Sequence, residues 1–176
     1  MEILAESTAT AIIHCAAEKI NLSEWLFTLK DHEYQSCSEG HIAGGISISK
    51  DGKRMSINVE KVADNLLVQH YIEEIGGRNH CRVNSVSDSI SSLGTTKLRI
   101  TWELKVTALS NDSCEFSNRV IVSATEEFLA LLKSINITDL AIVKSQMLQN
   151  VVLHNEEETP LFAINIERKA IADIWN

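Results

Sequence analysis
The stretch LAIVKSQMLQNVVLHNEEETPLF, residues 140–162, decides the fold, because it carries an apolar stripe at helical spacing that ends in a histidine and a carboxylate. Steps of three or four residues place the members of this stripe on one face of a helix. The members are Leu140, Val143, Met147, Val151, His154, Glu158 and Phe162. His154 and Glu158 lie one turn apart, so they either give two ligands to one metal ion or mark a helix end that reaches water. Pro160 follows at once and predicts a kink or a break in the helix.

The length and composition predict one globular domain over residues 1–176, with 44% hydrophobic and 23% charged residues. The net charge of −8 comes without a basic cluster, which argues against binding to nucleic acid or to an anionic membrane surface. No apolar run is long enough to span a bilayer and no signal peptide is visible, so we expect a cytoplasmic protein. The four cysteines form no CxxC pair and are expected to be reduced and mostly buried. The sequence leaves open whether the chain forms a homodimer.

Between His41 and Ala124 the hydrophobic pattern has a period of two residues, which is typical of strands. Asp51 and Gly52 form a hairpin turn signal inside this region. One strand is predicted to turn five apolar side chains to the same face: Leu98, Ile100, Trp102, Leu104 and Val106. The pattern predicts an antiparallel meander of about six strands, and an earlier strand over Thr8–Cys15 brings the sheet to about six or seven.

Helical signals flank the predicted sheet on both sides. Before it, Asn21 is placed as the N-cap of a short helix, and a second short helix or turn is expected over Asp31–Cys37. After it, Thr125 is a predicted N-cap, and Thr138 or Asp139 caps the long helix that contains residues 140–162. This order predicts an α+β fold in which a curved antiparallel sheet wraps a long C-terminal helix and leaves a cavity between them. That layout is the helix grip.

In overall order the chain resembles the START-like (SRPBCC) superfamily, which includes the birch-pollen-allergen fold and the polyketide cyclases. The resemblance covers the whole chain and implies a single START-like domain over residues 1–176. It also implies a cavity for a small hydrophobic or phenolic ligand. In this layout the stripe faces the sheet across the cavity, so His154 and Glu158 would point inward.

The sheet region offers two places for further metal ligands. His41 opens a strand beside glycines, and Glu73 and Glu74 lie at a strand end before a Gly-Gly break, where a bulge can redirect a side chain. Periodicity does not decide which of the two glutamates points inward. The predicted set contains two histidines and two carboxylates: His41, Glu73, His154 and Glu158. Imidazole and carboxylate ligands suit zinc, with iron or manganese as alternatives.

Within the START-like proteins, this pattern looks like that of the 2,4-diacetylphloroglucinol and phloretin hydrolases. Those enzymes use zinc to cleave a carbon–carbon bond between an acyl group and a phenolic ring. Their tyrosine-led histidine segment resembles YQSCSEGHI, which offers His41 as a ligand and Tyr34 as its polar partner. Their glutamate before Ile-Gly-Gly resembles EEIGG, which offers Glu73, with Glu74 as the alternative.

Their helical His-x-x-Glu-Glu motif resembles HNEEE, which offers His154 and Glu158, with Glu157 beside them. The resemblance implies a zinc-dependent hydrolase of a phenolic or other acyl-ketone substrate. A carrier for a hydrophobic small molecule is the second hypothesis. A metal-free, cyclase-like enzyme with Tyr71 or His70 as acid or base is the third.

Several other polar residues are candidates for the cavity. Tyr34 and His70 are the candidate catalytic groups, although His70 can equally be a hydrogen-bonded core histidine. Three further polar groups on strands can line the pocket: Asn58, Glu60 and Asn118. Trp102 belongs to an apolar row and is expected in the core.

Overall fold

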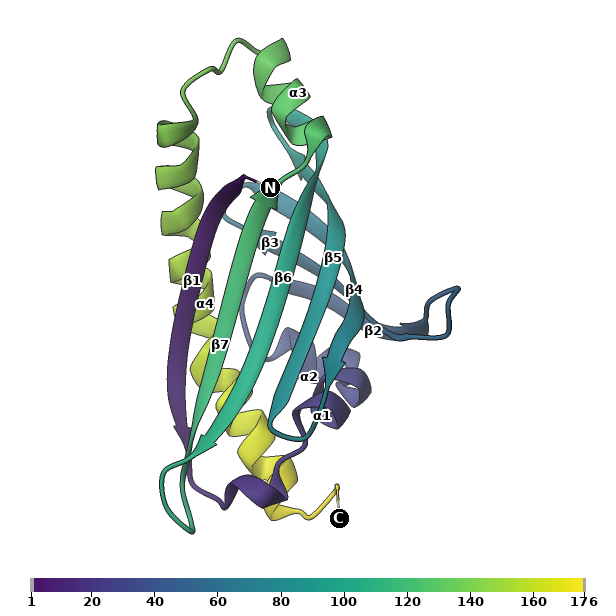
Figure 1. The fold of residues 1–176 in the computed structure, drawn as a ribbon, viewed down its shortest axis with the longest axis vertical. Coiled ribbons are helices and arrows are strands. Elements are labelled where there is room, and N and C mark those ends of the chain that lie inside the picture. The colour runs from purple at the N-terminus through teal and green to yellow at the C-terminus, as the bar shows by residue number, and fades with distance from the viewer. Residues whose placement is uncertain (1, 176) are drawn as a thin grey trace.

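The computed structural model describes residues 2–175, and seven strands form one antiparallel sheet in the order β1-β7-β6-β5-β4-β3-β2 (Figure 1). The strands are β1 (Ile3–Ile13), β2 (His41–Ile48), β3 (Arg54–Val62), β4 (Asn65–Gly76), β5 (His80–Ser91), β6 (Gly94–Ala108) and β7 (Cys114–Ala124). The helices are η1 (Ala17–Lys19), α1 (Leu22–Thr28), α2 (Asp31–Gln35), α3 (Glu126–Ser134) and α4 (Leu140–Ile171). The predicted helix-grip layout is therefore confirmed, with six strands in the meander and β1 as the seventh.

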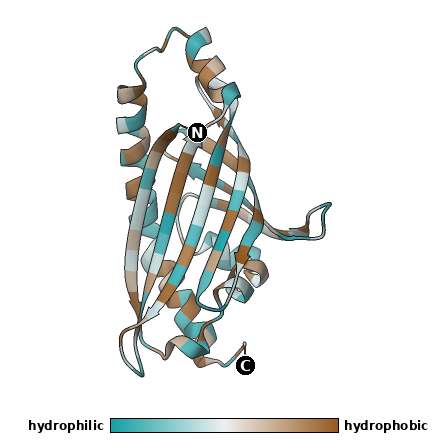
Figure 2. Cartoon of the chain, viewed as in Figure 1, coloured by the Kyte–Doolittle hydropathy of each residue, from teal (hydrophilic) through white to brown (hydrophobic). Residues whose placement is uncertain are grey.

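The sheet curves around α4, and α1 and α2 lie on the same side of it (Figure 1). Figure 2 shows hydrophobic and hydrophilic residues alternating along the strands that face the viewer. On β6 the predicted inward row is confirmed, since Leu98, Ile100, Trp102, Leu104 and Val106 are all buried. The period of two thus sends one set of side chains into the space between sheet and helix.

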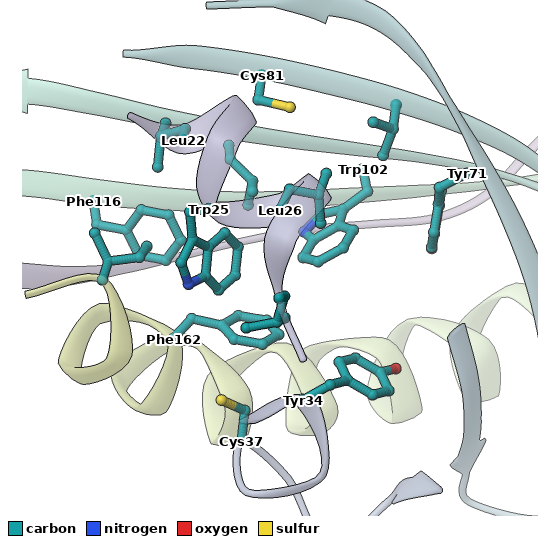
Figure 3. Packing of buried hydrophobic residues seen from close by; sticks show 14 of the residues in the cluster. Leu22, Trp25, Leu26, Tyr34, Cys37, Tyr71, Cys81, Trp102, Phe116 and Phe162 are labelled. Atoms are coloured by element: carbon teal, nitrogen blue, oxygen red, sulfur yellow. The ribbon is translucent and has the colours of Figure 1, made fainter. Parts of the chain in front are cut away.

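The aromatic side chains of three elements fill the middle of the core. The Trp25 ring of α1 lies edge-on to the Phe162 ring of α4, with centroids 5.1 Å apart, and Trp102 of β6 lies 5.7 Å from Phe162 (Figure 3). The indole N–H of Trp25 donates to Asn165 Oδ1 at 2.9 Å. These contacts fix α4 across the sheet and confirm that Trp102 belongs to the core.

The predicted helix starts are confirmed in detail. The Asn21 side chain accepts from the Glu24 amide, and the Thr125 side chain accepts from the Phe128 amide. The long helix α4 is capped by Asp139, whose side chain accepts from the Ala141 amide. Side-chain caps satisfy amides that a helix leaves unpaired at its start, so the sequence identifies these ends well.

Two predicted boundaries differ from the structure. β1 begins at Ile3 instead of Thr8, because its early residues pair with β7 up to Ser123 despite their weak strand pattern. Helix α4 does not break at Pro160, since it continues as helix to Ile171. Proline removes one backbone donor, and Phe162 just beyond it is fully buried in the core. No helix within residues 2–175 is long and apolar enough to cross a membrane.

Candidate metal centre
Four side chains from three elements converge beneath the sheet: His41 at the start of β2, Glu60 on β3, and His154 and Glu158 on α4. Each offers one ligand atom, and these atoms all lie within 4.8 Å of one another. His41, Glu60 and Glu158 are buried, and His154 is half-buried. We call this group the four-residue cluster.

The spacing of the cluster matches that of four ligands around one ion. His41 Nε2 lies 3.1 Å from Glu158 Oε2 and 3.6 Å from Glu60 Oε2. His154 Nε2 lies 3.5 Å from each of the same two oxygens. A tetrahedral ion with bonds of about 2.1 Å holds its ligand atoms roughly 3.4 Å apart. The residues present therefore fit a four-coordinate divalent metal ion.

The ring of His41 is oriented by Tyr34. Its Nδ1 lies 2.8 Å from the Tyr34 backbone oxygen, which can only accept, so Nδ1 carries a proton and Nε2 is left to face the cluster. The Tyr34 ring also stacks on the His41 ring with centroids 3.9 Å apart. A backbone carbonyl behind the distal ring nitrogen is a common support for metal-binding histidines.

Neutral donors hold the two carboxylates. The Tyr34 hydroxyl donates to Glu60 Oε2 at 2.7 Å, and Gln69 Nε2 donates to Glu60 Oε1 at 2.8 Å. Asn118 Nδ2 donates to Glu158 Oε1 at 2.9 Å. The predicted polar residues Glu60 and Asn118 thus lie at the site. Their contacts fix the carboxylates in place without neutralising their charge.

The histidines of the cluster balance the charge of its two carboxylates. The residues that line the adjoining cavity include no Lys or Arg. Burial raises the pKa of Glu60, but His154, His41 and the Tyr34 hydroxyl together lower it to about 2. Burial lowers the pKa of His154, but Glu60 and Glu158 raise it to about 9. Without an ion, the cluster therefore retains a proton on His154 to offset two buried carboxylates.

His154 Nε2 is buried and has no aligned hydrogen-bond partner within residues 2–175, although two carboxylate oxygens lie 3.5 Å away. Buried polar atoms are nearly always paired, so this nitrogen either shares a proton with these two carboxylates or gives its lone pair to an ion. An unpaired imidazole nitrogen and two carboxylates are the donor set that a divalent ion needs.

A cavity of about 60 Å³ adjoins the cluster. Its polar wall includes Tyr34, Asn58, Gln69 and Tyr71, and its apolar wall comes from β3, β4, β6, β7 and α4. The apolar members are Val62, Leu67, Ile100, Trp102, Val120, Val122 and Val151. This space accommodates a few water molecules or a short acyl group.

The structure places Glu73 outside the cluster, which corrects its prediction as a metal ligand. Its carboxylate binds the Arg54 guanidinium, with Glu73 Oε2 3.1 Å from Arg54 Nε. A Cβ at Gly76 would clash with the Glu73 carboxylate, so that glycine makes room for the ion pair. The alternative, Glu74, binds Arg82 and Asn84 on the exposed side.

His70 also lies away from the cavity. Its neighbours Gln69 and Tyr71 line the cavity, so alternation along β4 turns His70 to the opposite face of the sheet. Its prediction as a cavity group is therefore corrected. Tyr34 does line the cavity and contacts both His41 and Glu60, and its catalytic role stays a prediction.

Glu60 takes the place that was predicted for Glu73. It was a candidate for the pocket wall, and the signal for a closer role is the polar row Ser56, Asn58 and Glu60 on the buried face of β3. In the sheet, Glu60 pairs directly with His41. Gln69 was not identified as a site residue from the sequence. The signal that could have found it is again a polar residue on a buried strand face, because Leu67 and Tyr71, two residues away on either side, are buried.

Neither a protein-family model nor a curated protein matches this sequence. Three solved structures are similar in fold. TTHA0849 from Thermus thermophilus aligns with 14% identity and a TM-score of 0.55 over 95% of this chain and 97% of that one. A conserved protein from Geobacillus kaustophilus aligns with 6% identity and a TM-score of 0.53 over 93% and 96%.

The di-domain ARO/CYC BexL from the BE-7585A biosynthetic pathway aligns with 10% identity and a TM-score of 0.52. The alignment covers 92% of this chain and 49% of BexL. Together with the seven-stranded sheet and the long C-terminal helix, these likenesses confirm the helix-grip fold.

Proposed function
We propose that this protein binds a divalent metal ion, zinc in the first instance, and hydrolyses a small acyl-ketone held in the adjoining cavity. The observation that carries this proposal is the spacing of the four-residue cluster, in which each histidine nitrogen lies 3.1–3.6 Å from both carboxylate oxygens. Two neutral histidines and two carboxylates balance the charge of a divalent ion.

A purely structural role for the cluster is less favourable. Two buried carboxylates with no Lys or Arg among the residues of the cavity carry a large desolvation cost unless a cation compensates them. In the ion-free state a proton on imidazole provides that compensation only in part. The cluster is therefore better suited to exchanging this proton for a metal ion than to stabilising the fold.

The residues around the cluster have separate tasks. A bound ion would supply Lewis acidity toward a carbonyl oxygen or a water molecule. Tyr34 orients His41 through its backbone oxygen and Glu60 through its hydroxyl. Burial and the charges of Glu60 and Glu158 raise the pKa of the Tyr34 hydroxyl well above 10, so it remains a donor.

The cavity adds selectivity for size and polarity. Its apolar members exclude bulk water from the reacting group, and its volume of about 60 Å³ suits the acyl part of a substrate. Hydrolysis adds the hydroxyl of water to the acyl carbon and a proton to the carbon that leaves. The products are a carboxylic acid and the deacylated compound, as expected from the resemblance to the phloroglucinol-type hydrolases.

A second candidate function is a metal-free START-like carrier or cyclase. The likeness to the di-domain ARO/CYC BexL, at a TM-score of 0.52, favours it. On this view His154 keeps its proton and the polar wall of the cavity orients a hydrophobic ligand. The same scaffold supports both kinds of protein, so the site must decide between them.

Elemental analysis of tag-free protein separates the two candidates. After exposure to zinc and dialysis, we expect nearly one zinc per native chain, and little in the His154→Ala variant. His32→Ala, which changes an exposed histidine of α2, is the matched control and should retain the metal. Zinc-loaded protein is then assayed against acylated phenols for release of the carboxylic acid. A native protein without stoichiometric metal that retains an apolar molecule would instead support the carrier.

A further inference from the structure
The side-chain oxygen of Gln69 is buried in the wall of the cavity without a partner. Gln69 is 2% exposed and lines the cavity. Its Nε2 donates to Glu60 Oε1, whereas its Oε1 has no hydrogen-bond partner within residues 2–175. Buried acceptors are nearly always paired, so this oxygen indicates a missing donor.

The orientation of the Gln69 amide follows from its contact with Glu60. If the amide were turned over, its oxygen would face Glu60 Oε1, and two acceptors would lie 2.8 Å apart. Glu60 therefore holds the NH₂ group and leaves the amide oxygen for something else. Since Glu60 belongs to the four-residue cluster, Gln69 Oε1 lies on the side of the cavity where we propose the metal ion.

Tyr71 offers a hydroxyl group to the same cavity. It is the next inward residue on β4, it is 3% exposed, and it lines the same cavity. Its hydroxyl has no hydrogen-bond partner in the part of the chain that the structure describes. Burial and the charges of Glu60 and Glu158 raise the pKa of this hydroxyl well above 10, so it keeps its proton and can donate.

An acceptor and a donor in one wall are complementary to a single hydroxyl group, which both donates and accepts. A carbonyl oxygen on the ligand could use only Tyr71, and an ammonium group could use only Gln69. A hydroxyl satisfies both protein groups at once.

We propose that Gln69 and Tyr71 form a hydroxyl-binding subsite, in which Gln69 Oε1 accepts a hydrogen bond from a ligand hydroxyl and the Tyr71 hydroxyl donates to the same ligand oxygen. This rests on the proposed function, because the carbonyl of the same ligand would face the four-residue cluster. Gln69 contacts Glu60 directly, so the ligand hydroxyl must lie within a few bonds of that carbonyl. The substrate class is therefore a hydroxy-carbonyl compound, and the cavity of about 60 Å³ limits its inner part to a few heavy atoms.

A pair of small probes tests the subsite on zinc-loaded protein. Hydroxyacetone and butan-2-one have the same number of heavy atoms, and only the first carries a hydroxyl. We expect the native protein to bind hydroxyacetone about tenfold more tightly in an NMR titration, since two hydrogen bonds depend on that group. In Gln69→Met and in Tyr71→Phe this preference should fall to about twofold or less. Tyr71→Phe leaves both hydrogen bonds of Glu60 in place, so it separates ligand recognition from support of the metal ligand.

His70→Ala is the matched control, because His70 lies between the two residues on the opposite face of the sheet and should leave the preference unchanged. The proposal is overturned if the native protein binds both probes equally, as expected when water alone satisfies the two groups. It is also overturned if hydroxyacetone does not bind, or if the preference survives both substitutions. Zinc content is measured for every variant. A preference without bound zinc supports the subsite while refuting the metal-dependent function.

Discussion
Two carboxylates buried on opposite faces of the same sheet are compensated in different ways. Glu60 faces the cavity, where the groups that lower its pKa to about 2 against the effect of burial are His154, His41 and the Tyr34 hydroxyl. Glu103, on the opposite face of β6, also has its pKa lowered to about 2 against the effect of burial, by His80, Lys105 and Arg119.

The partners of Glu103 include permanent cations. Lys105 Nζ lies 3.1 Å from its Oε1, and an Arg119 guanidinium nitrogen lies 3.1 Å from its Oε2. Lysine and arginine stay charged near neutral pH, so this carboxylate needs no other cation. The basic partners of Glu60 are histidines, and a histidine that releases its proton becomes a neutral ligand with a free electron pair. The identity of the partner, more than burial or the pKa of the carboxylate, therefore distinguishes the proposed metal ligand from the structural ion pair.

The largest expected effect is on metal affinity, through Glu60. Glu60→Gln should weaken zinc binding at least about 100-fold, since loss of a supporting contact alone typically costs 10–100-fold. Isothermal titration with zinc measures the change, and circular dichroism confirms that the variant is folded. Glu103→Gln is the matched control and should bind zinc as the native protein does. Equal zinc affinity of native protein and Glu60→Gln would contradict the assignment of Glu60 as a ligand.

For the free energy of unfolding, we expect Glu103 to be the carboxylate that matters. We expect Glu103→Gln to lower the free energy of unfolding by about 1–2 kcal/mol, because it leaves a partly desolvated group of cations without its counter-charge. Those cations are a third to a half exposed, so solvent screening keeps the loss small. Urea unfolding at neutral pH and two salt concentrations measures it, and high salt should reduce the difference. If Glu103→Gln were more stable than the native protein, the ion pairs of Glu103 would not be stabilising.

The pH dependence of the Glu103 contribution has a definite sign. Its pKa falls from an ordinary 4.5 to about 2 in the folded protein, so the contribution is complete above pH 4.5. It is lost as the pH falls through the window from about 4.5 to 2, where the unfolded chain takes up the proton first. The difference in unfolding free energy between native protein and Glu103→Gln should therefore shrink between pH 5 and pH 3. A difference that stays constant over this range would contradict the lowered pKa.

The fold was predictable because each of its elements has a periodic signal. The period of two in β6 and the helical stripe of α4 specify which faces meet, and local caps at Asn21, Thr125 and Asp139 mark the helix starts. The continuation through Pro160 was not predictable from the local sequence, since a proline inside a helix removes a backbone donor and favours a kink or an end.

The candidate site was predictable where one element sets the geometry. His154 and Glu158 share a helix face whatever the rest of the chain does. The sheet ligand depends on long-range register, and the structure has irregular pairing at both relevant places, between His41 and Ala43 and between Glu73 and Ile75. A shift of one residue turns a side chain to the other face, which the local sequence does not encode.

The smallest expected effect belongs to Glu73, because this carboxylate, like Glu103, has an arginine partner. Glu73→Gln should leave zinc affinity within about twofold of the native value. It should lower the free energy of unfolding by less than about 1 kcal/mol, because Arg54 keeps its ion pair with Glu24 at 2.6 Å. The same zinc titration and urea unfolding measure both quantities. A loss of zinc binding in Glu73→Gln would place Glu73 back among the ligands. Unchanged binding, beside the loss expected for Glu60→Gln, would tie metal binding to the carboxylate whose partners are histidines.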